Sequence, residues 1–218
     1  MAERENFRRR SARDFHDEAG NHLSRVSLLT ALAQRQVADH QSEANEAQPQ
    51  VQTLLQDINS NVQVVREGMR DFIWALDPDN DNAYELGLRL KRFGQELFTH
   101  HHADFSTALL SPALRNISLR PDQRRHLVLL FKEAMHNSFK HATDATEVSF
   151  SLHADAHTLT AEWRDNGQGF SPQAKADGAG LKNMRARANK IDAQLALNSQ
   201  EGTLVEVSIS TKRGMASE

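Results

Sequence analysis

Residues 51–76 read VQTLLQDINSNVQVVREGMRDFIWAL, and their apolar side chains recur at alternating steps of four and three residues. The stripe consists of Val51, Leu55, Ile58, Val62, Val65, Met69, Phe72 and Leu76. Such a spacing lines up side chains along one narrow face of a helix, as in helical bundles. Gly68 is the only weak helix former in the stripe, and Asp77-Pro78 predicts the helix end. One long amphipathic helix is therefore expected here.

The segment before this helix has a similar but less regular spacing. Its apolar positions are Ala12, Phe15, Ala19, Val26, Leu29, Ala33 and Val37, with His22 or Leu23 filling the remaining slot. Residues 39–50 are polar and contain Pro49, a composition typical of a loop. Two helices joined by one loop form a helical hairpin. The apolar stripe of this hairpin cannot be buried within a single copy. A second copy would complete a four-helix bundle, so we expect a homodimer.

The periodicity changes after Pro78. Helices are predicted over residues 83–100 and from Pro121 to about Ala142. Strand alternation follows at 148–152, 159–163 and 205–209, and a helix carrying Leu181 to Ile191 lies between the second and third of these. This order predicts an α+β two-layer sandwich with helices on one face of a mixed sheet. We expect two domains, an α-helical hairpin over residues 1–78 and the sandwich over 79–218.

Composition excludes several classes of protein. The 218 residues carry a formal net charge of −3, so no overall positive field favours nucleic acid, and the N-terminal arginines are interpreted as a solvated helix face. There is no cysteine, which excludes disulfides and thiolate chemistry. No apolar run approaches the roughly 20 residues of a membrane-spanning helix. We therefore expect no nucleic-acid partner and no membrane segment in this chain.

Four short motifs follow one another in the second half of the chain. Glu133, Asn137 and His141 recur every four residues on the predicted long helix, a pattern that ordinary surface helices also show. Asp165-x-Gly167-x-Gly169 follows a strand, and glycines there would let backbone approach a ligand closely. Gly178-x-Gly180 opens the next helix, whose N-terminal amides could hold phosphate oxygens. Gly202-Thr203 precedes the last strand.

As a set, these motifs resemble the nucleotide-binding boxes of the GHKL ATPases, the fold shared by histidine kinases, gyrases and related chaperones. The resemblance implies ATP and Mg²⁺ as cofactors, with Asn137 binding the metal, Glu133 nearby and Asp165 accepting a hydrogen bond from the adenine amino group. The other residues that it places at the nucleotide are Lys140, His141, Gly167, Gly169, Gly178, Gly180, Leu181 and Thr203. This family usually ends the helix after the second glycine box with two glycines, whereas this chain has Asp192-Ala193. Aspartate tolerates the left-handed conformation better than most residues, so we expect a local stability cost there and no change of function.

Residues 11–23, SARDFHDEAGNHL, resemble the dimerisation helix of the histidine kinase subfamily typified by nitrate and lipid-fluidity sensors. The resemblance implies that His16 is the phosphoacceptor and that Asp17 is its base. Gly20, one helical turn on, costs about 1 kcal/mol relative to alanine and would let a partner approach, although a tolerated glycine remains the alternative. Asn21 stands where the subfamily usually has Gln or His that orients a hydrolytic water, so phosphatase activity is an open possibility.

The resulting expectation is a protein histidine kinase that autophosphorylates His16 and passes the phosphoryl group to an aspartate in the receiver domain of a response regulator. Two alternatives are a GHKL serine kinase and a catalytically degenerate ATP-binding scaffold. We expect a cytoplasmic location, as the cytoplasmic part of a membrane sensor or otherwise. A sensor segment is expected to lie outside this chain.

Overall fold

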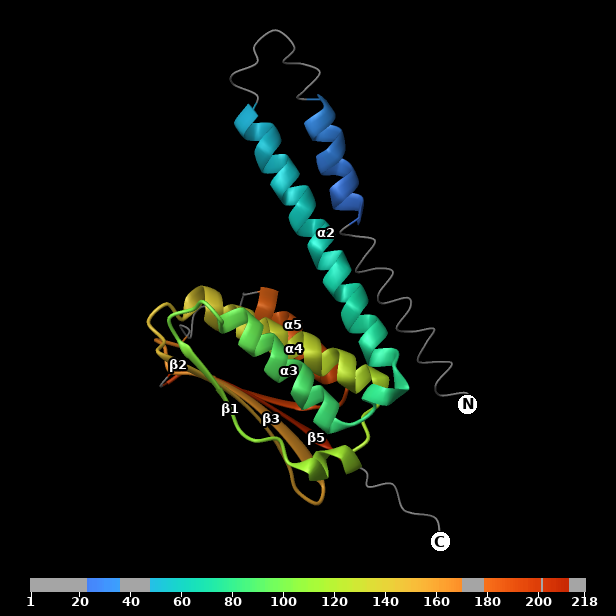
Figure 1. Cartoon of the computed structure of the whole chain (residues 1–218), viewed down its shortest axis with the longest axis vertical. Coiled ribbons are helices and arrows are strands. Elements are labelled where there is room, and N and C mark those ends of the chain that lie inside the picture. Colours follow the sequence, from blue (N-terminus) through green and yellow to red (C-terminus); the bar gives the residue numbers. More distant parts are fainter. Residues whose placement is uncertain (1–22, 36–47, 170–178, 201, 212–218) are drawn as a thin grey trace. The chain divides into compact units, whose positions relative to one another are not determined.

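The computed structural model describes residues 23–35, 48–169, 179–200 and 202–211. The chain divides into two units, one up to Trp74 and one from Ala75 onward. The predicted domain division at residues 78 and 79 stays a prediction. The first unit contains a helix over residues 23–35 and helix α2 (Gln48–Leu76) as far as Trp74, which confirms the helical hairpin (Figure 1). None of the described helices is long and apolar enough to cross a lipid bilayer.

Helix α2 ends where the sequence predicts. Its last residue is Leu76, and Pro78 begins a short 3-10 helix, η1 (Pro78–Asn80). The Asp77 carboxylate accepts a hydrogen bond from the backbone N–H of Asp79 at 3.0 Å. Proline cannot continue the α-helical hydrogen-bond ladder, and Asp77 satisfies an N–H at the start of the new turn.

The second unit is an α+β sandwich. Its helices are α3 (Ala83–Phe98), η2 (Pro112–Asn116), α4 (Pro121–His141) and α5 (Ala179–Lys190). Its strands are β1 (Asp104–Thr107), β2 (Glu147–Ala154), β3 (Thr158–Asp165), β4 (Gln194–Asn198) and β5 (Thr203–Ser210). The sheet order is β1-β2-β3-β5-β4, with β1 parallel to β2 and the other pairs antiparallel. Helices α3, α4 and α5 lie on one face of this mixed sheet, as predicted (Figure 1).

The core lies between the helices and the apolar face of the sheet. Alternate residues of β2 and β3 are buried, among them Phe150 and Trp163, which are fully buried. From the helix side, Phe131 of α4 meets Phe150 edge-on with ring centroids 5.7 Å apart. The alternation that predicted β2, β3 and β5 is therefore the alternation between this core and the outer face. Strands β1 and β4, at the two edges of the sheet, are not among the three alternating segments that the sequence predicts, because they have only four and five residues.

Capping residues fix the starts of α3 and α4. Asn82 accepts a hydrogen bond from the backbone N–H of Glu85 at 3.1 Å. At α4, the Gln123 side chain accepts from the backbone N–H of Arg120 at 3.0 Å, and Pro121 occupies the first helical position as expected.

A neutral histidine lies in the first half of α4. Burial lowers the pKa of His126 from its usual 6.5 to about 4, and the positive charges of Arg125, Lys190 and Arg187 add to the shift against the opposing effect of Asp122. His126 is therefore uncharged near pH 7, which lets it be buried without the cost of burying a charge.

The end of α5 has the left-handed conformation that we expect where Asp192 stands in place of the usual glycine. Asp192 has a φ of 55°, the left-handed conformation that favours glycine. The backbone N–H of Ala193 bonds to the Ala188 carbonyl at 3.0 Å and that of Asp192 to the Asn189 carbonyl at 3.3 Å. These two bonds form a Schellman motif, in which Asp192 occupies the position that is usually glycine.

We expect Asp192→Gly to raise the free energy of unfolding by about 0.5–1 kcal/mol, because glycine adopts positive φ without the steric cost of a Cβ atom. Thermal denaturation should show a midpoint higher by roughly 2–4 °C. Asn189→Gly, still inside α5, is the matched control and should lower the midpoint. A midpoint that stays constant or falls in Asp192→Gly would show that the aspartate makes a compensating contact.

Candidate functional site

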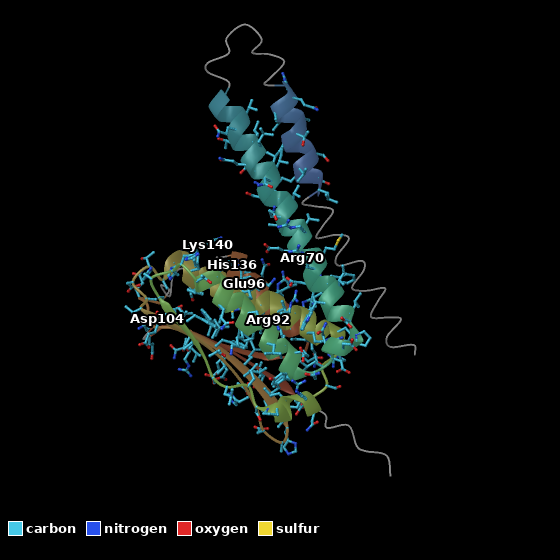
Figure 2. All side chains as sticks on the ribbon, in the orientation of Figure 1. Arg70, Arg92, Glu96, Asp104, His136 and Lys140 are labelled. Carbon is cyan, nitrogen blue, oxygen red and sulfur yellow. The ribbon has the colours of Figure 1, made fainter. Side chains whose placement is uncertain are left out.

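The polar stripe predicted on the long helix lies on α4. Glu133 and Asn137 are half-buried, whereas Lys140 and His141 are exposed in the last turn. Figure 2 shows Lys140 near the C-terminal end of α4. The stripe therefore runs from a partly enclosed acidic and amide pair to two exposed basic side chains.

The start of α5 lies directly against Glu133 and Asn137. A Cβ atom added to Gly180 would overlap the Glu133 carboxylate and would come within 3.3 Å of the Asn137 side-chain nitrogen. Only glycine lets the helix approach α4 this closely. The structure thus brings together two motifs that stand more than 40 residues apart in the sequence. Leu181, the next residue, is half-buried.

Asp165 is the last residue of β3, and its carboxylate is buried. One oxygen, Oδ1, accepts hydrogen bonds from the backbone N–H groups of Gly167 at 3.2 Å and Thr203 at 3.0 Å. The other oxygen, Oδ2, accepts from the hydroxyl of Ser138 on α4. Three donors from three different segments therefore hold this side chain in place.

Thr203 reaches Asp165 through the pairing of β3 with β5, in which the two residues stand opposite each other. Gly202 precedes it with a φ of 86°, and a Cβ atom there would overlap the carbonyl oxygen of Asp165. Glycine is thus required at position 202 for conformation and for space. The predicted fourth motif joins the site through this pairing.

The loop after β3 is anchored to the chain that follows α4. The Asn166 side-chain oxygen accepts from the backbone N–H groups of Thr146 at 2.9 Å and Glu147 at 3.0 Å. Asp144 accepts from the N–H of Gln168 at 3.1 Å. Gly167 is buried in this loop, and Gly169 has a φ of 70°. These contacts set the path of the loop that carries the two predicted glycines.

Three side chains of the site lie outside the motifs that the sequence predicts. Ser138 bonds to Asp165, while Asn166 and Asp144 anchor the loop. A signal for Ser138 was present, since it is a small polar residue one position after Asn137 on a helix that otherwise turns apolar side chains to the sheet. For Asn166 and Asp144 the sequence carries no such signal. The predicted residues His16, Asp17, Asn21 and Gly178 lie outside the described residues.

The donor set near Gly180 suits a magnesium ion bound together with phosphates. Asn137 and Glu133 offer an amide oxygen and carboxylate oxygens, the hard ligands that Mg²⁺ prefers, and the ion usually takes only one or two protein ligands beside phosphate oxygens and water. Across the described ranges there is no cluster of three or more His, Cys, Asp or Glu residues suited to holding a metal ion alone. Glu133 and Asn137 thus fit a metal that arrives with a nucleotide.

Two family models match this chain. Residues 8–81 match the family described as histidine kinase, and residues 122–213 match the family of histidine kinase-, DNA gyrase B- and HSP90-like ATPases. The second match contains every site residue from Glu133 to Thr203.

Curated relatives align with nearly the whole chain at modest identity. The sensor histidine kinase YvfT of Bacillus subtilis is 27% identical over 92% of this chain and 49% of its own length. The histidine-protein kinase/phosphatase UhpB of Salmonella typhimurium is 24% identical over 94% of this chain and 39% of its own, and the nitrate/nitrite sensor NarQ of Escherichia coli is 27% identical over 95% and 35%. The chain thus spans between a third and a half of the length of these relatives.

Solved structures share the fold at low sequence identity. The blue-light activated histidine kinase of Erythrobacter litoralis superposes with a TM-score of 0.53 and 16% identity, covering 81% of this chain and 63% of that one. The histidine kinase AdeS of Acinetobacter baumannii gives a TM-score of 0.54 and 12% identity over 91% of this chain and 98% of that one. At these identities the comparison establishes the fold alone.

Proposed function

Since this chain belongs to the histidine kinases, joining a histidine kinase segment to an ATP-binding domain of the gyrase and HSP90 type, we propose that it phosphorylates its own His16 with ATP. The phosphoryl group then passes to an aspartate of a response regulator. The observation that carries the proposal is the convergence of Asp165 and Thr203 at one end of α4 and of Gly180 on Glu133 and Asn137. This arrangement suits the adenine base of ATP at Asp165 and its phosphates near Asn137.

The proposed reaction has two phosphoryl transfers. An imidazole nitrogen of His16 attacks the γ-phosphorus of ATP, the bond to the bridging oxygen breaks, and ADP leaves with that electron pair. Asp17 takes the proton lost by the imidazole. In the second transfer, a carboxylate oxygen of the receiver attacks the phosphorus and the N–P bond breaks. Its electron pair returns to the imidazole nitrogen, and the imidazole regains the proton that Asp17 had taken. Catalysis of such transfers rests mainly on positioning and charge neutralisation.

Each predicted residue has a part in this proposal. Asn137, with Glu133 beside it, would hold the magnesium ion, which would neutralise phosphate charge when bound. Asp165 accepts a hydrogen bond from the adenine amino group, and Thr203 lies beside the base. The remaining residues border the phosphates or the covering loop, namely Lys140, His141, Gly167, Gly169, Gly178, Gly180 and Leu181. Two of these, Lys140 and His141, would attract phosphate by charge and hydrogen bonding.

The same active centre could also remove phosphate from the response regulator. Asn21 keeps the carboxamide that can orient a water molecule but is one methylene shorter than glutamine. Two relatives, UhpB and DegS of Brevibacillus brevis, carry the description kinase/phosphatase. A cytoplasmic location fits the proposal, because ATP and response regulators are found there.

We also propose that the working unit is a homodimer built on the helical hairpin. In a single copy, the stripe of α2 is only partly covered: Leu55, Val62 and Met69, which are spaced seven residues apart, are 56%, 43% and 47% exposed. The 23–35 helix likewise exposes Leu23, Leu28 and Leu32. A row of exposed apolar side chains at heptad spacing supports coverage by a second copy.

We expect Val62→Asp to dissociate the dimer, because it places an unpaired charge in the apolar seam at a cost of several kcal/mol per copy. Light scattering should then give the mass of one chain instead of two. Val62 is already partly exposed in the single chain, so the hairpin itself should survive and circular dichroism should change little.

Val64→Asp is the matched control for this prediction. Val64 is 49% exposed, a fraction similar to that of Val62. It stands about 200° around the helix from Val62 and therefore outside the stripe. It should leave the dimer intact. A Val62→Asp protein that stays dimeric would exclude the stripe as the dimer seam.

The proposed activity is tested by incubation with ATP labelled on the γ-phosphate. A histidine kinase should acquire label that is lost in acid and retained in base. Acid-stable label would favour the alternative of a serine kinase, and ATP binding without any label would favour a degenerate scaffold.

A further inference from the structure

The two oxygens of the Asp165 carboxylate have different surroundings. Each carboxylate oxygen can accept about two hydrogen bonds. Oδ1 already accepts two, from the backbone N–H groups of Gly167 and Thr203. Oδ2 accepts one, from the Ser138 hydroxyl, and within the described ranges no second donor bonds to it. A ligand amino group would therefore bond to Oδ2.

Trp163 decides the direction of the Ser138 hydrogen bond. An indole N–H can only donate, and the Trp163 Nε1 lies 2.9 Å from the Ser138 Oγ. Ser138 thus accepts from the indole, and its single hydrogen remains for Oδ2 of Asp165. The result is a chain of donors that runs from Trp163 through Ser138 to Asp165.

Burial makes this chain rigid. Trp163 is 0% and Ser138 4% exposed, so water does not compete for these bonds. The indole ring contacts the rings of Phe98 and Phe105, with centroids 5.7 and 6.2 Å away. The ring cannot turn without disturbing these contacts, so its N–H stays aimed at Ser138.

We propose that Ser138 and Trp163 are positioning residues that set the selectivity of the site for the nucleotide base. They hold Oδ2 so that its free lone pair faces the exocyclic amino group of a 6-aminopurine. A 6-oxopurine would place its carbonyl oxygen, an acceptor, against Oδ2, which is also an acceptor, so its binding is disfavoured. The inference rests on the proposed assignment of Asp165 to the adenine base. Without the Ser138 hydroxyl, Oδ2 loses the bond that fixes the rotation of the carboxylate.

The test compares two nucleotides that differ by a single group, ATP and purine riboside triphosphate, which has hydrogen in place of the 6-amino group. Dissociation constants are measured by calorimetry on the full chain. Wild-type protein should prefer ATP by roughly 10- to 100-fold, the effect of one hydrogen bond to a charged group. In Ser138→Ala this preference should fall to about threefold, chiefly through weaker ATP binding. General damage to the pocket would weaken both nucleotides equally and leave the ratio unchanged.

Three further variants complete the experiment. Trp163→Phe keeps an aromatic ring but removes the N–H, and its preference should lie between those of wild type and Ser138→Ala. Ser138→Thr keeps a hydroxyl and should restore most of the preference. Thr160→Ala, on the same strand as Trp163, is the matched control, because it removes a hydroxyl that bonds to Ser208 Oγ of β5 at 3.2 Å, and it should match wild type.

The outcomes separate this inference from the proposed function. Wild-type protein that binds both nucleotides equally would overturn the assignment of Asp165 to the base. Wild-type preference that persists in full in both Ser138→Ala and Trp163→Phe would overturn the positioning role alone. Should Ser138→Ala fail to fold, Trp163→Phe with Ser138→Thr decides the question.

Discussion

Replacing His16 with glutamine is expected to abolish autophosphorylation while ATP still binds. Glutamine keeps a polar side chain of similar length but lacks the imidazole nitrogen that forms the N–P bond. Loss of a nucleophile typically lowers the rate by a factor of about 10³ or more, so label from γ-labelled ATP should fall to background. The proposed ATP contacts all lie in the second unit, from Glu133 to Thr203, so ATP affinity should change less than about twofold.

His22→Gln is the control for this prediction, because it removes another histidine from the same matched segment, residues 8–81. It should keep its label. Label that persists on His16→Gln would mean that a different residue accepts the phosphoryl group, and peptide mapping of the acid-labile label would then locate it.

Asp165→Asn should have the second largest effect. Asparagine retains one oxygen, but its NH₂ group must then face either the N–H groups of Gly167 and Thr203 or the Ser138 hydroxyl and the ligand. A donor thus replaces an acceptor in a site with three donors, and the charge-assisted bond to the base is lost. ATP affinity should fall by roughly 100-fold or more, and no kinase activity should be detected at micromolar ATP.

Asp155→Asn is the matched control. The Asp155 carboxylate accepts backbone N–H bonds from His157 at 2.7 Å and Thr158 at 2.8 Å, and these bonds hold the pKa of Asp155 below its usual value. It lies in the β2–β3 turn, away from the site, and its substitution should leave ATP affinity unchanged. Calorimetry on both variants, with circular dichroism to check folding, decides the matter. Unchanged ATP affinity in Asp165→Asn would mean that the adenine base does not bind at Asp165.

The elements that the sequence predicted are those in which a period repeats several times. The stripe of α2 repeats through eight positions, and β2, β3 and β5 are each eight residues long with clear alternation. Strands β1 and β4 have four and five residues, too few for a period to stand out from the surrounding polar sequence. The parallel pairing of β1 with β2 also depends on the path of the intervening chain, which no local pattern encodes.

The same limit applies within the site. Motif spacing and resemblance identified Glu133, Asn137, Asp165, Gly180 and Thr203, since each belongs to a short recognisable pattern. The spacing could not say that Ser138 would meet Asp165, because that bond joins residues 27 positions apart on a helix and a strand. It depends on the rotation of α4 against the sheet, which the whole core determines.

By itself, therefore, the sequence determined the two kinds of domain, because their apolar spacings involve only neighbouring residues. The resemblance of its short motifs to a known family added the nucleotide site and the left-handed turn at Asp192. The tertiary structure alone decided which side chains meet. The pairing of β3 with β5 brings Thr203 to Asp165, and the approach of α5 to α4 places Gly180 against Glu133. The donor chain from Trp163 through Ser138 to Oδ2 exists only because the packing of α4 on β3 brings these groups within hydrogen-bonding distance in a buried interior.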